Sequence, residues 1–398
     1  HDIISFWLFH TVVKCYEHTG EVPFESVMIN GHVLDENREK MSSSRGNVVL
    51  PEEVMDEYPV DAIRFWSASA SVGDDFPYKE GDLEAGERLL QKLWNASRLI
   101  DQLTPEPDAV TEPDEEDLAA VDRWMLAELD DAVASLTEQF EEHEYSKARN
   151  ELRSFFWNSF CDDYLEIAKQ RLDDSEGGAD ARSTEYALLT AHRTFLKLFA
   201  PFLPHVTEEL WQRLYTAEQS SASPPSSSTR EDADDSADEL DSIHTVDWPE
   251  TRGYEADLEA GERAMEVIAA LRRYKTDSGL ALNADLDRVQ VYGNVAGFED
   301  AVAEAMHVAD LETLDEAPEV TTEVTGVDLD YSLVGPEYGS QVGDIDAAIE
   351  SGEFEEVDGK LEVAGVELDS EMYEIEEART YSGDGEMIET ESAILIVG

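Results

Sequence analysis

A chain of 398 residues is long enough for several domains, each with its own core. It carries 93 Asp and Glu against 28 Lys and Arg, a formal net charge of -65, yet 41% of its residues are apolar. This apolar content excludes a wholly disordered acidic protein, so the acidic residues are expected on the surface of folded domains. Such a surface is typical of a cytoplasm of concentrated salt, where charge repulsion is screened within roughly 3 Å at 1 M. We therefore expect a halophile's protein that partly unfolds at low salt.

Cysteine usage and hydropathy set further limits. Cys15 and Cys161 both lie in apolar helical sequence and in no paired metal-binding spacing, so we expect buried thiols, no disulfide and no metal site. No run approaches the ~20 apolar residues of a membrane span. No signal peptide is recognisable. We therefore expect a soluble, cytoplasmic protein that does not bind membranes.

The first 50 residues contain a helix, a strand and a loop of unusual composition. Residues 3–18 predict a largely buried helix, and residues 27–34 predict a strand that runs into a turn. The loop 40–47 then reads Lys-Met-Ser-Ser-Ser-Arg-Gly-Asn. Its lysine supplies charge, its hydroxyls donate hydrogen bonds, and its small residues let the backbone approach, all of which suit a polyphosphate. Taken alone, this composition is more often that of an ordinary surface turn.

Helical periodicity dominates the next part of the chain. Its aromatic side chains Phe156, Trp157 and Trp211 could stack on bases, but core packing is the favoured interpretation. The predicted elements are a helix over 51–66, a turn at 74–78, an amphipathic helix over 82–103, a linker over 104–116 and an up-and-down helical bundle over 117–216.

The remainder begins with residues 217–245, which are mostly Ser, Pro, Asp and Glu and predict a disordered insertion. The helix predicted over 255–276 ends in Arg272-Arg273-Tyr274-Lys275, the densest basic run of the chain. This run either contacts RNA phosphates or satisfies the dipole of its own helix. The elements predicted after residue 285 are a strand over 287–293, a helix over 297–307, a strand over 319–325, a helix over 339–350 and strands through 372–397.

The loop and its surroundings resemble class Ia aminoacyl-tRNA synthetases, and among them the valine-specific branch. The second signature loop of that class usually reads Lys-Met-Ser-Lys-Ser, and residues 40–44 stand in its place. The family's first signature, His-x-Gly-His, and its editing insertion have no counterpart here, so the chain looks like the C-terminal part of a longer enzyme. The likeness is collinear from residue 1 to about residue 215, in the stretches 2–7, 33–35, 46–49, 58–66, 92–98, 156–169 and 201–211.

The resemblance implies a multidomain, mainly α fold. The implied parts are the C-terminal remnant of a Rossmann-like catalytic domain with the signature loop (1–50), a helical stem-contact region (51–103), a linker (104–116), an anticodon-binding helical bundle (117–216), a disordered acidic Ser/Pro insertion (217–245), a linking helix (246–284) and a small α/β accessory domain (285–398).

The resemblance also implies an ATP site. Asp2 would contact the ribose, although it is equally well placed as a helix N-cap. Backbone groups at 31–33 would hold the adenine, and His32 is not expected to act as an acid or base, because adenylate formation from an ionised carboxylate needs no proton abstraction. The residues implied to bind ATP are Asp2, Gly31, His32, Val33, Lys40, Met41, Ser42, Ser43 and Ser44.

The loop departs from the family pattern at Ser43, where a second lysine usually lies nearest the transferring phosphate. A serine cannot supply the charge that stabilises the pentavalent phosphate. The catalytic candidates are therefore Lys40, Ser43 and Arg45, with Lys40 or Arg45 taking the duty of the missing lysine, or Mg2+ carrying more of it. The alternative is a degenerate, inactive loop.

Phosphate contacts weaken steeply with salt. An acidic protein in concentrated KCl must therefore hold tRNA by shape, stacking and base-edge hydrogen bonds, with its few cations clustered at the RNA. The candidates for tRNA contact are Arg88, Lys92 and Arg98 on the helix predicted over 82–103, Lys147, Arg149, Arg153, Lys169 and Arg171 in the bundle, and Arg272, Arg273 and Lys275.

The implied function of the full enzyme is to activate valine with ATP and Mg2+ as valyl-adenylate and to transfer it to valine-specific tRNA, as a monomer. This part alone is not expected to catalyse. Isoleucyl- and leucyl-tRNA synthetases are the nearest alternatives, and the stretches 92–97 and 160–164 favour valine. A hypothesis of another class is a non-catalytic tRNA-binding module.

Overall fold

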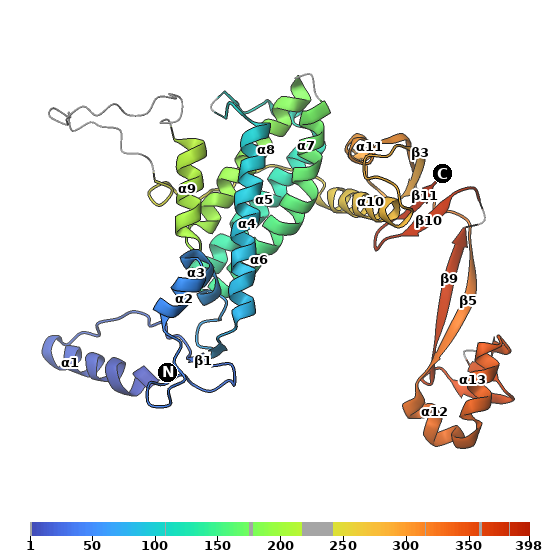
Figure 1. The fold of residues 1–398 in the computed structure, drawn as a ribbon, viewed down its shortest axis with the longest axis horizontal. Coiled ribbons are helices and arrows are strands. Elements are labelled where there is room, and N and C mark those ends of the chain that lie inside the picture. The colour runs from blue at the N-terminus through green and yellow to red at the C-terminus, as the bar shows by residue number, and fades with distance from the viewer. Residues whose placement is uncertain are drawn as a thin grey trace. The chain divides into compact units, whose positions relative to one another are not determined.

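The chain divides into two compact units, His1–Glu262 and Arg263–Gly398, and each is described by itself. In the first unit nearly all of the regular secondary structure is helical, and the second combines helices with small sheets (Figure 1). The computed structural model describes residues 2–107, 109–174, 178–216, 242–314, 316–357, 360–381 and 383–398.

The N-terminal helix is much more exposed than its sequence predicts. A π-helical segment, Ile4–Leu8, continues into α1, Phe9–Thr19. The side chains of Phe6 and Trp7 are 65% and 74% exposed, so the prediction of a largely buried helix is wrong. Its apolar residues are packed by few other side chains in the part of the chain that the structure describes. Cys15 is likewise only half-buried.

The predicted strand over 27–34 is reduced to two residues. Its ordered part is β1, Val33–Leu34, which pairs in parallel with β2, Phe76–Pro77. A strand persists only where a neighbour accepts its backbone hydrogen bonds. Within the described residues β2 is the one strand that pairs with β1, so the segment before it is irregular.

The helix predicted over 51–66 is two helices. They are α2, Pro51–Glu57, and α3, Val60–Ser67. The break falls at Pro59, which has no N–H to donate and restricts the residue before it to extended conformations. Tyr58 accordingly has φ -123° and ψ 146°.

The bundle is longer than predicted, because α4 packs against α8 and α9 as well as against α3 (Figure 1). It therefore begins near residue 80 and not at 117. Phe156 is fully buried and Trp211 nearly so, as core packing predicts, while Trp157 is half-buried. The helices are α4, Glu80–Leu103; α5, Ala120–Glu141; α6, Tyr145–Phe155; a π-helical segment, Phe156–Tyr164; α7, Leu165–Asp174; α8, Ala179–Phe199; and α9, Pro204–Tyr215.

The predicted insertion 217–245 lies largely outside the described residues. The described chain resumes at Ser242, whose hydroxyl donates to the carboxylate of Glu208 (2.9 Å). The N–H of Ile243 donates to the same carboxylate (2.9 Å), and its side chain is buried. Residues 242–245 are therefore an anchored turn, which corrects the C-terminal boundary of that prediction.

The second unit contains most of α10, Leu258–Asp277, and a four-stranded sheet of order β10-β11-β3-β4. β3 and β4 are parallel and are connected through α11, whereas β3 and β11 are antiparallel. The strand β4 was not predicted. The elements are β3, Leu286–Tyr292; α11, Glu299–Met306; β4, Val308–Leu314; β10, Glu386–Glu389; and β11, Ile394–Val397.

A two-stranded ribbon carries a separate small core. The ribbon is β5, Val320–Leu329, paired with β9, Tyr373–Tyr381. The chain segment between β5 and β9 forms this core, which packs around Val334, Ile345 and Leu361. Its elements are α12, Tyr331–Tyr338; α13, Val342–Glu350; β6, Phe354–Val357; β7, Lys360–Val363; and β8, Val366–Asp369.

No helix in the described ranges is both long and apolar enough to cross a bilayer.

Candidate functional site

The loop 40–47 is seated on the helices that follow it. Met41 packs against an apolar cluster formed by Val54, Trp66, Tyr78 and Leu83. The N–H of Met41 also donates to the carbonyl of Val33 (3.4 Å), which continues the pairing of β1. One side of the loop is thus held by apolar contacts, while Ser43 to Gly46 are exposed.

Gly31 is required by a close approach of the backbone. A Cβ at this position would lie 2.0 Å from the carbonyl oxygen of Asp74. The N–H of the next residue, His32, donates to the carboxylate of Asp75 (2.6 Å), and its carbonyl accepts from Phe76 (3.0 Å). Both backbone groups of His32 are therefore already paired. An adenine contact through the N–H requires its bond to Asp75 to be exchanged, whereas the carbonyl has a second lone pair.

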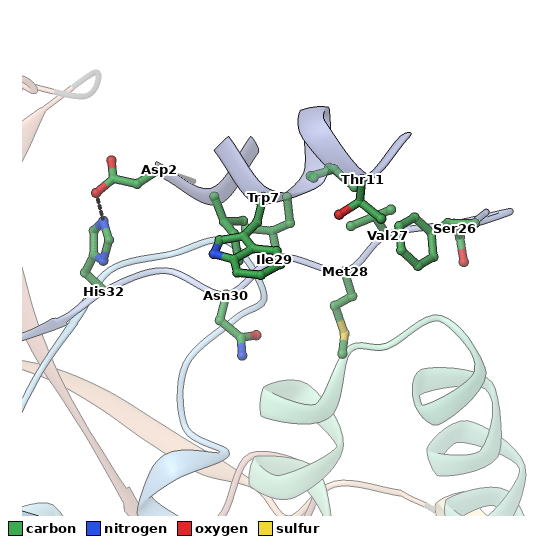
Figure 2. A pocket seen from close by; sticks show the side chains of 12 residues that line it. Asp2, Trp7, Thr11, Ser26, Val27, Met28, Ile29, Asn30 and His32 are labelled. Carbon is green, nitrogen blue, oxygen red and sulfur yellow. Dashed lines mark ion pairs between the residues drawn. The ribbon is translucent and has the colours of Figure 1, made fainter. Parts of the chain in front are cut away.

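Three predicted site residues converge in front of β1. Lys40 Nζ lies 2.6 Å from Asp2 Oδ2. His32 Nε2 lies 3.8 Å from the same oxygen, as Figure 2 shows. The hydrogen bond and charge of Lys40 lower the pKa of Asp2. The ammonium is about half exposed, so an incoming phosphate can replace the carboxylate as its partner. The Oδ2 atom of Asp2 could then accept from a ribose hydroxyl in place of Lys40.

Other polar groups of the loop contact each other or the turn before it. The hydroxyls of Ser42 and Ser44 lie 2.9 Å apart. Arg45 pairs with Glu39 (3.2 Å), and both side chains are exposed. Gly46 has φ 73°, which a residue with a Cβ rarely adopts. Ser43 and Arg45 are thus exposed at the surface of the loop, and Arg45 pairs with Glu39 and not with a partner of Lys40.

A cavity of about 690 Å3 opens beside this group. Figure 2 shows Trp7 and Ile29 over its centre and Asp2 and His32 at one end. Its lining is mainly apolar, which suits the flat face of a base more than a phosphate. Over the described residues, no group of three or more His, Cys, Asp or Glu side chains is placed to hold a metal ion.

Two cations predicted to contact RNA are bound to buried groups of the fold, and one of them, Arg149, is itself buried. Arg149 is 8% exposed; its Nε donates to the carbonyl of Phe65 (2.6 Å), and its guanidinium lies over that ring. Burial lowers its pKa to about 10, so it remains charged at neutral pH. Arg171 lies 4.0 Å from the buried carboxylate of Asp122 and donates to Thr184 (3.1 Å). Both predictions are wrong, because these guanidiniums pair with buried groups of the fold.

Lys275 is a third such correction. It is fully buried, and its Nζ donates to the carbonyls of Leu282 (3.0 Å), Ala284 (2.7 Å) and Met306 (2.7 Å). Burial lowers its pKa. The ammonium closes the turn after α10 and cannot also reach RNA.

The other predicted cations remain at or near the surface. Arg88 pairs with Glu84 on its own helix, Lys147 pairs with Glu144, and Lys92 bridges to Asp162 (2.7 Å). Arg98, Arg153 and Arg273 are exposed, whereas Lys169 and Arg272 are half-buried.

Sequence reasoning missed a second group of cations. Arg193 and Lys197, one turn apart on α8, line a cavity of about 460 Å3 together with Arg252 and Trp248. Burial, and to a smaller extent the two arginines, lower the pKa of Lys197, while Asp247 opposes the shift. Some 55 residues separate Lys197 from Arg252 along the chain, and no local pattern indicates that they meet.

Comparison with known families places both parts of this chain in one class. Residues 1–79 match the tRNA synthetases of class I (I, L, M and V), and residues 122–291 match the anticodon-binding domain of tRNA ligase. The chain therefore belongs to the class I tRNA synthetases and contains an anticodon-binding domain.

Within that class, the chain belongs with the valine–tRNA ligases. The valine–tRNA ligase of Haloarcula marismortui is 69% identical over 399 residues, which are 100% of this chain and 41% of that relative. That of Methanothermobacter thermautotrophicus is 33% identical over 92% of this chain and 40% of its own length. The chain thus spans about two fifths of the curated relatives that it matches.

Among solved structures, the LeuRS-tRNA-LeuAMS ternary complex of Agrobacterium radiobacter K84 has a TM-score of 0.43 and 21% identity. It covers 62% of this chain, which corresponds to 26% of that protein chain. The overlap is partial, so the family assignment rests on the sequence.

Proposed function

We propose that this chain is the part of an ATP-dependent, AMP-forming valine–tRNA ligase that supplies the phosphate loop and the tRNA-binding bundle. The observation that carries the proposal is 69% identity to a valine–tRNA ligase over the whole chain. The contacts of Asp2 with His32 and Lys40 support it. These are three of the residues implied to bind ATP, and they meet although up to 38 positions separate them along the chain.

In the proposed reaction the carboxylate of valine attacks the α-phosphorus of ATP. The α–β phosphoanhydride bond breaks and pyrophosphate leaves with the bond's electron pair. A terminal ribose hydroxyl of tRNA then attacks the activated carbonyl, and AMP leaves. Lys40 would hold the phosphates in exchange for Asp2, with Ser42 and Ser44 as hydroxyl donors and Ser43 and Arg45 within reach of the same region. Mg2+ would supply further neutralisation of phosphate charge.

For tRNA, we infer that the surface cations of the first unit are the contacts. The exposed members are Arg88, Arg98, Lys147 and Arg153, and the partly buried members are Lys92 and Lys169. Arg272 and Arg273 are the candidates of the second unit. We further infer that the protein is cytoplasmic and monomeric. Size-exclusion chromatography in concentrated KCl tests the oligomeric state.

The test uses the full-length gene product in concentrated KCl. We expect valine-dependent ATP–pyrophosphate exchange and charging of valine tRNA, with much lower rates for isoleucine and leucine. Lys40→Ala should lower the exchange rate roughly 100-fold, as loss of one charge-stabilising donor does. Lys14→Ala, an exposed lysine of α1, is the matched control and should leave the rate unchanged. A protein that binds tRNA but supports no exchange with any amino acid would be a binding module instead.

A further inference from the structure

One amide side chain ties together the two ends of the loop 40–47. Asn47 Oδ1 accepts from the N–H of Ser42 (2.9 Å). Asn47 Nδ2 donates to Asp35 Oδ2 (2.8 Å) and, at 3.4 Å, to the carbonyl of Lys40. The last residue of the loop therefore contacts its first and third residues and the turn before it.

Asp35, in the preceding turn, is the second member of this arrangement, and we call the hydrogen-bonded pair Asp35 and Asn47 the clamp. Its Oδ1 accepts from the N–H groups of Asn37 and Glu39, both at 2.9 Å, while its Oδ2 accepts from Asn47. These hydrogen bonds, that of Asn47 foremost, lower the pKa of Asp35. The carboxylate is thus ionised at neutral pH and acts only as an acceptor, which is the role that all three donors require.

The rest of the loop has few restraints of its own. Ser43 to Gly46 are exposed, and the Arg45–Glu39 pair is a solvent-exposed ion pair of the kind that contributes little. Phosphoryl chemistry nevertheless needs donors fixed in advance at the place where charge develops, and a displacement near 1 Å can cost about 100-fold in rate.

We propose that Asp35 and Asn47 are positioning residues that hold the loop in the one conformation presenting Lys40, Ser42 and Ser44 to the triphosphate of ATP. The inference rests on the proposed function for its kinetic consequence. It concerns neither a phosphate contact nor a proton transfer, because the amide and the carboxylate are both consumed by bonds within the loop and turn.

The two side chains are nearly isosteric, which allows a reciprocal exchange. In Asp35→Asn, two amide NH2 groups would face each other. In Asn47→Asp, two carboxylates would do so. In the double variant, the amide at 35 can donate to the carboxylate at 47, whose other oxygen still accepts from Ser42, and the amide oxygen at 35 still accepts from Asn37 and Glu39. Every bond of 2.9 Å or shorter is thereby retained, and the contact to the Lys40 carbonyl alone is lost.

The experiment measures valine-dependent pyrophosphate exchange by the full-length enzyme, and the rate of tryptic cleavage after Lys40 and Arg45. We expect each single variant, and Asn47→Ala, to lower kcat 10- to 100-fold with a smaller change in the KM for ATP, and to be cleaved faster in the loop. The double exchange should recover kcat to within a few-fold of wild type. Asn37→Ala, whose side chain is exposed in the same turn, is the control and should match wild type.

Two results overturn the inference. One is a kcat for Asn47→Ala within twofold of that of Asn37→Ala. The other is a double variant as impaired as the combined single variants. If wild type itself shows no valine-dependent exchange, the proposed function is wrong. The rate of tryptic cleavage in the loop then tests the positioning role by itself. Equal cleavage rates for Asn47→Ala and Asn37→Ala would exclude that role.

Discussion

At the residue scale, ionisable side chains inside the bundle are held by several partners each. Asp122 is fully buried and accepts from the hydroxyls of Tyr164 (2.8 Å), Ser183 (2.7 Å) and Thr184 (3.0 Å), with Arg171 at 4.0 Å. Burial raises its pKa, and the charge of Arg171 and the three hydroxyls oppose that shift. A buried charge with this many partners fixes the packing of the helices that supply them.

The buried Arg149 predicts a stability effect in place of a loss of RNA contact. Arg149→Ala should lower the free energy of unfolding by about 2–3 kcal/mol, because the carbonyl of Phe65 loses its hydrogen-bond donor and the ring of Phe65 loses its contact with the guanidinium. Arg153→Ala, one turn further along α6 and exposed, should change it by less than about 0.5 kcal/mol. Denaturant unfolding of both variants checks this. An Arg149→Ala protein of unchanged stability but weakened tRNA binding would restore the original prediction.

His192 predicts a pH dependence of stability. Its Nε2 lies 2.8 Å from the hydroxyl of Ser97, and burial lowers its pKa from 6.5 to about 3. Below pH 6.5 the unfolded chain takes up a proton here that the folded chain does not, so this site destabilises the fold as pH falls from 6.5 towards 3. The loss is about 1.4 kcal/mol per pH unit, or about 2 kcal/mol at pH 5.

Comparing variants isolates this contribution from the many carboxylates. Between pH 7.5 and pH 5, wild type should lose about 2 kcal/mol more stability than His192→Gln, which has no imidazole to protonate. His18→Gln, exposed on α1, should follow wild type. Parallel pH profiles for wild type and His192→Gln would show that this imidazole titrates normally.

At the element scale, α3 connects the seat of the loop to the bundle. α9 begins after Leu203, which has no side-chain acceptor to cap the helix. Asp61 of α3 serves instead: its carboxylate accepts from the N–H groups of His205 (3.1 Å) and Val206 (2.7 Å). Arg64 of the same helix donates to the carbonyl of Pro201 (3.0 Å). A cap from another helix fixes the relative position of the two elements, which a local cap does not.

Removing this cap should loosen the connection. Asp61→Ala is expected to lower the free energy of unfolding by about 2 kcal/mol, since two helix N–H groups lose their acceptor in a buried place. Asp56→Ala on the exposed face of α2 is the matched control and should change it by less than about 0.5 kcal/mol. Hydrogen exchange of the His205 and Val206 amides should accelerate in the first variant alone. Unchanged exchange there would show that water replaces the carboxylate without cost.

At the scale of the whole molecule, the net charge of -65 makes the stability of the fold depend on the salt concentration. Few of its residues are cationic, and three of these bind buried groups of the fold: Arg149, Arg171 and Lys275. The surface is therefore still more acidic than the composition suggests. Unscreened repulsion between surface carboxylates opposes the compact state.

We therefore expect the circular dichroism melt to move to higher temperature from dilute buffer to multimolar KCl, with partial loss of helix at low salt. Screening is the physical reason, because the Debye length falls from roughly 30 Å at 0.01 M to roughly 3 Å at 1 M. Sucrose, which is excluded from the surface but does not screen, should restore less of the helix at the same low salt. Identical melts in dilute buffer and KCl would contradict the halophilic interpretation.

The sequence by itself determined most of the helices, the loop 40–47 and the family. Helical periodicity and turn composition are local properties, so elements such as α11 and β3 were predicted within a few residues. The tertiary structure alone decided which cations are buried, that the segment before β1 is not a strand, and that Asn47 closes the loop on Asp35. The reason is physical: a charge is buried or exposed, and a strand is paired or not, according to residues that are distant in sequence.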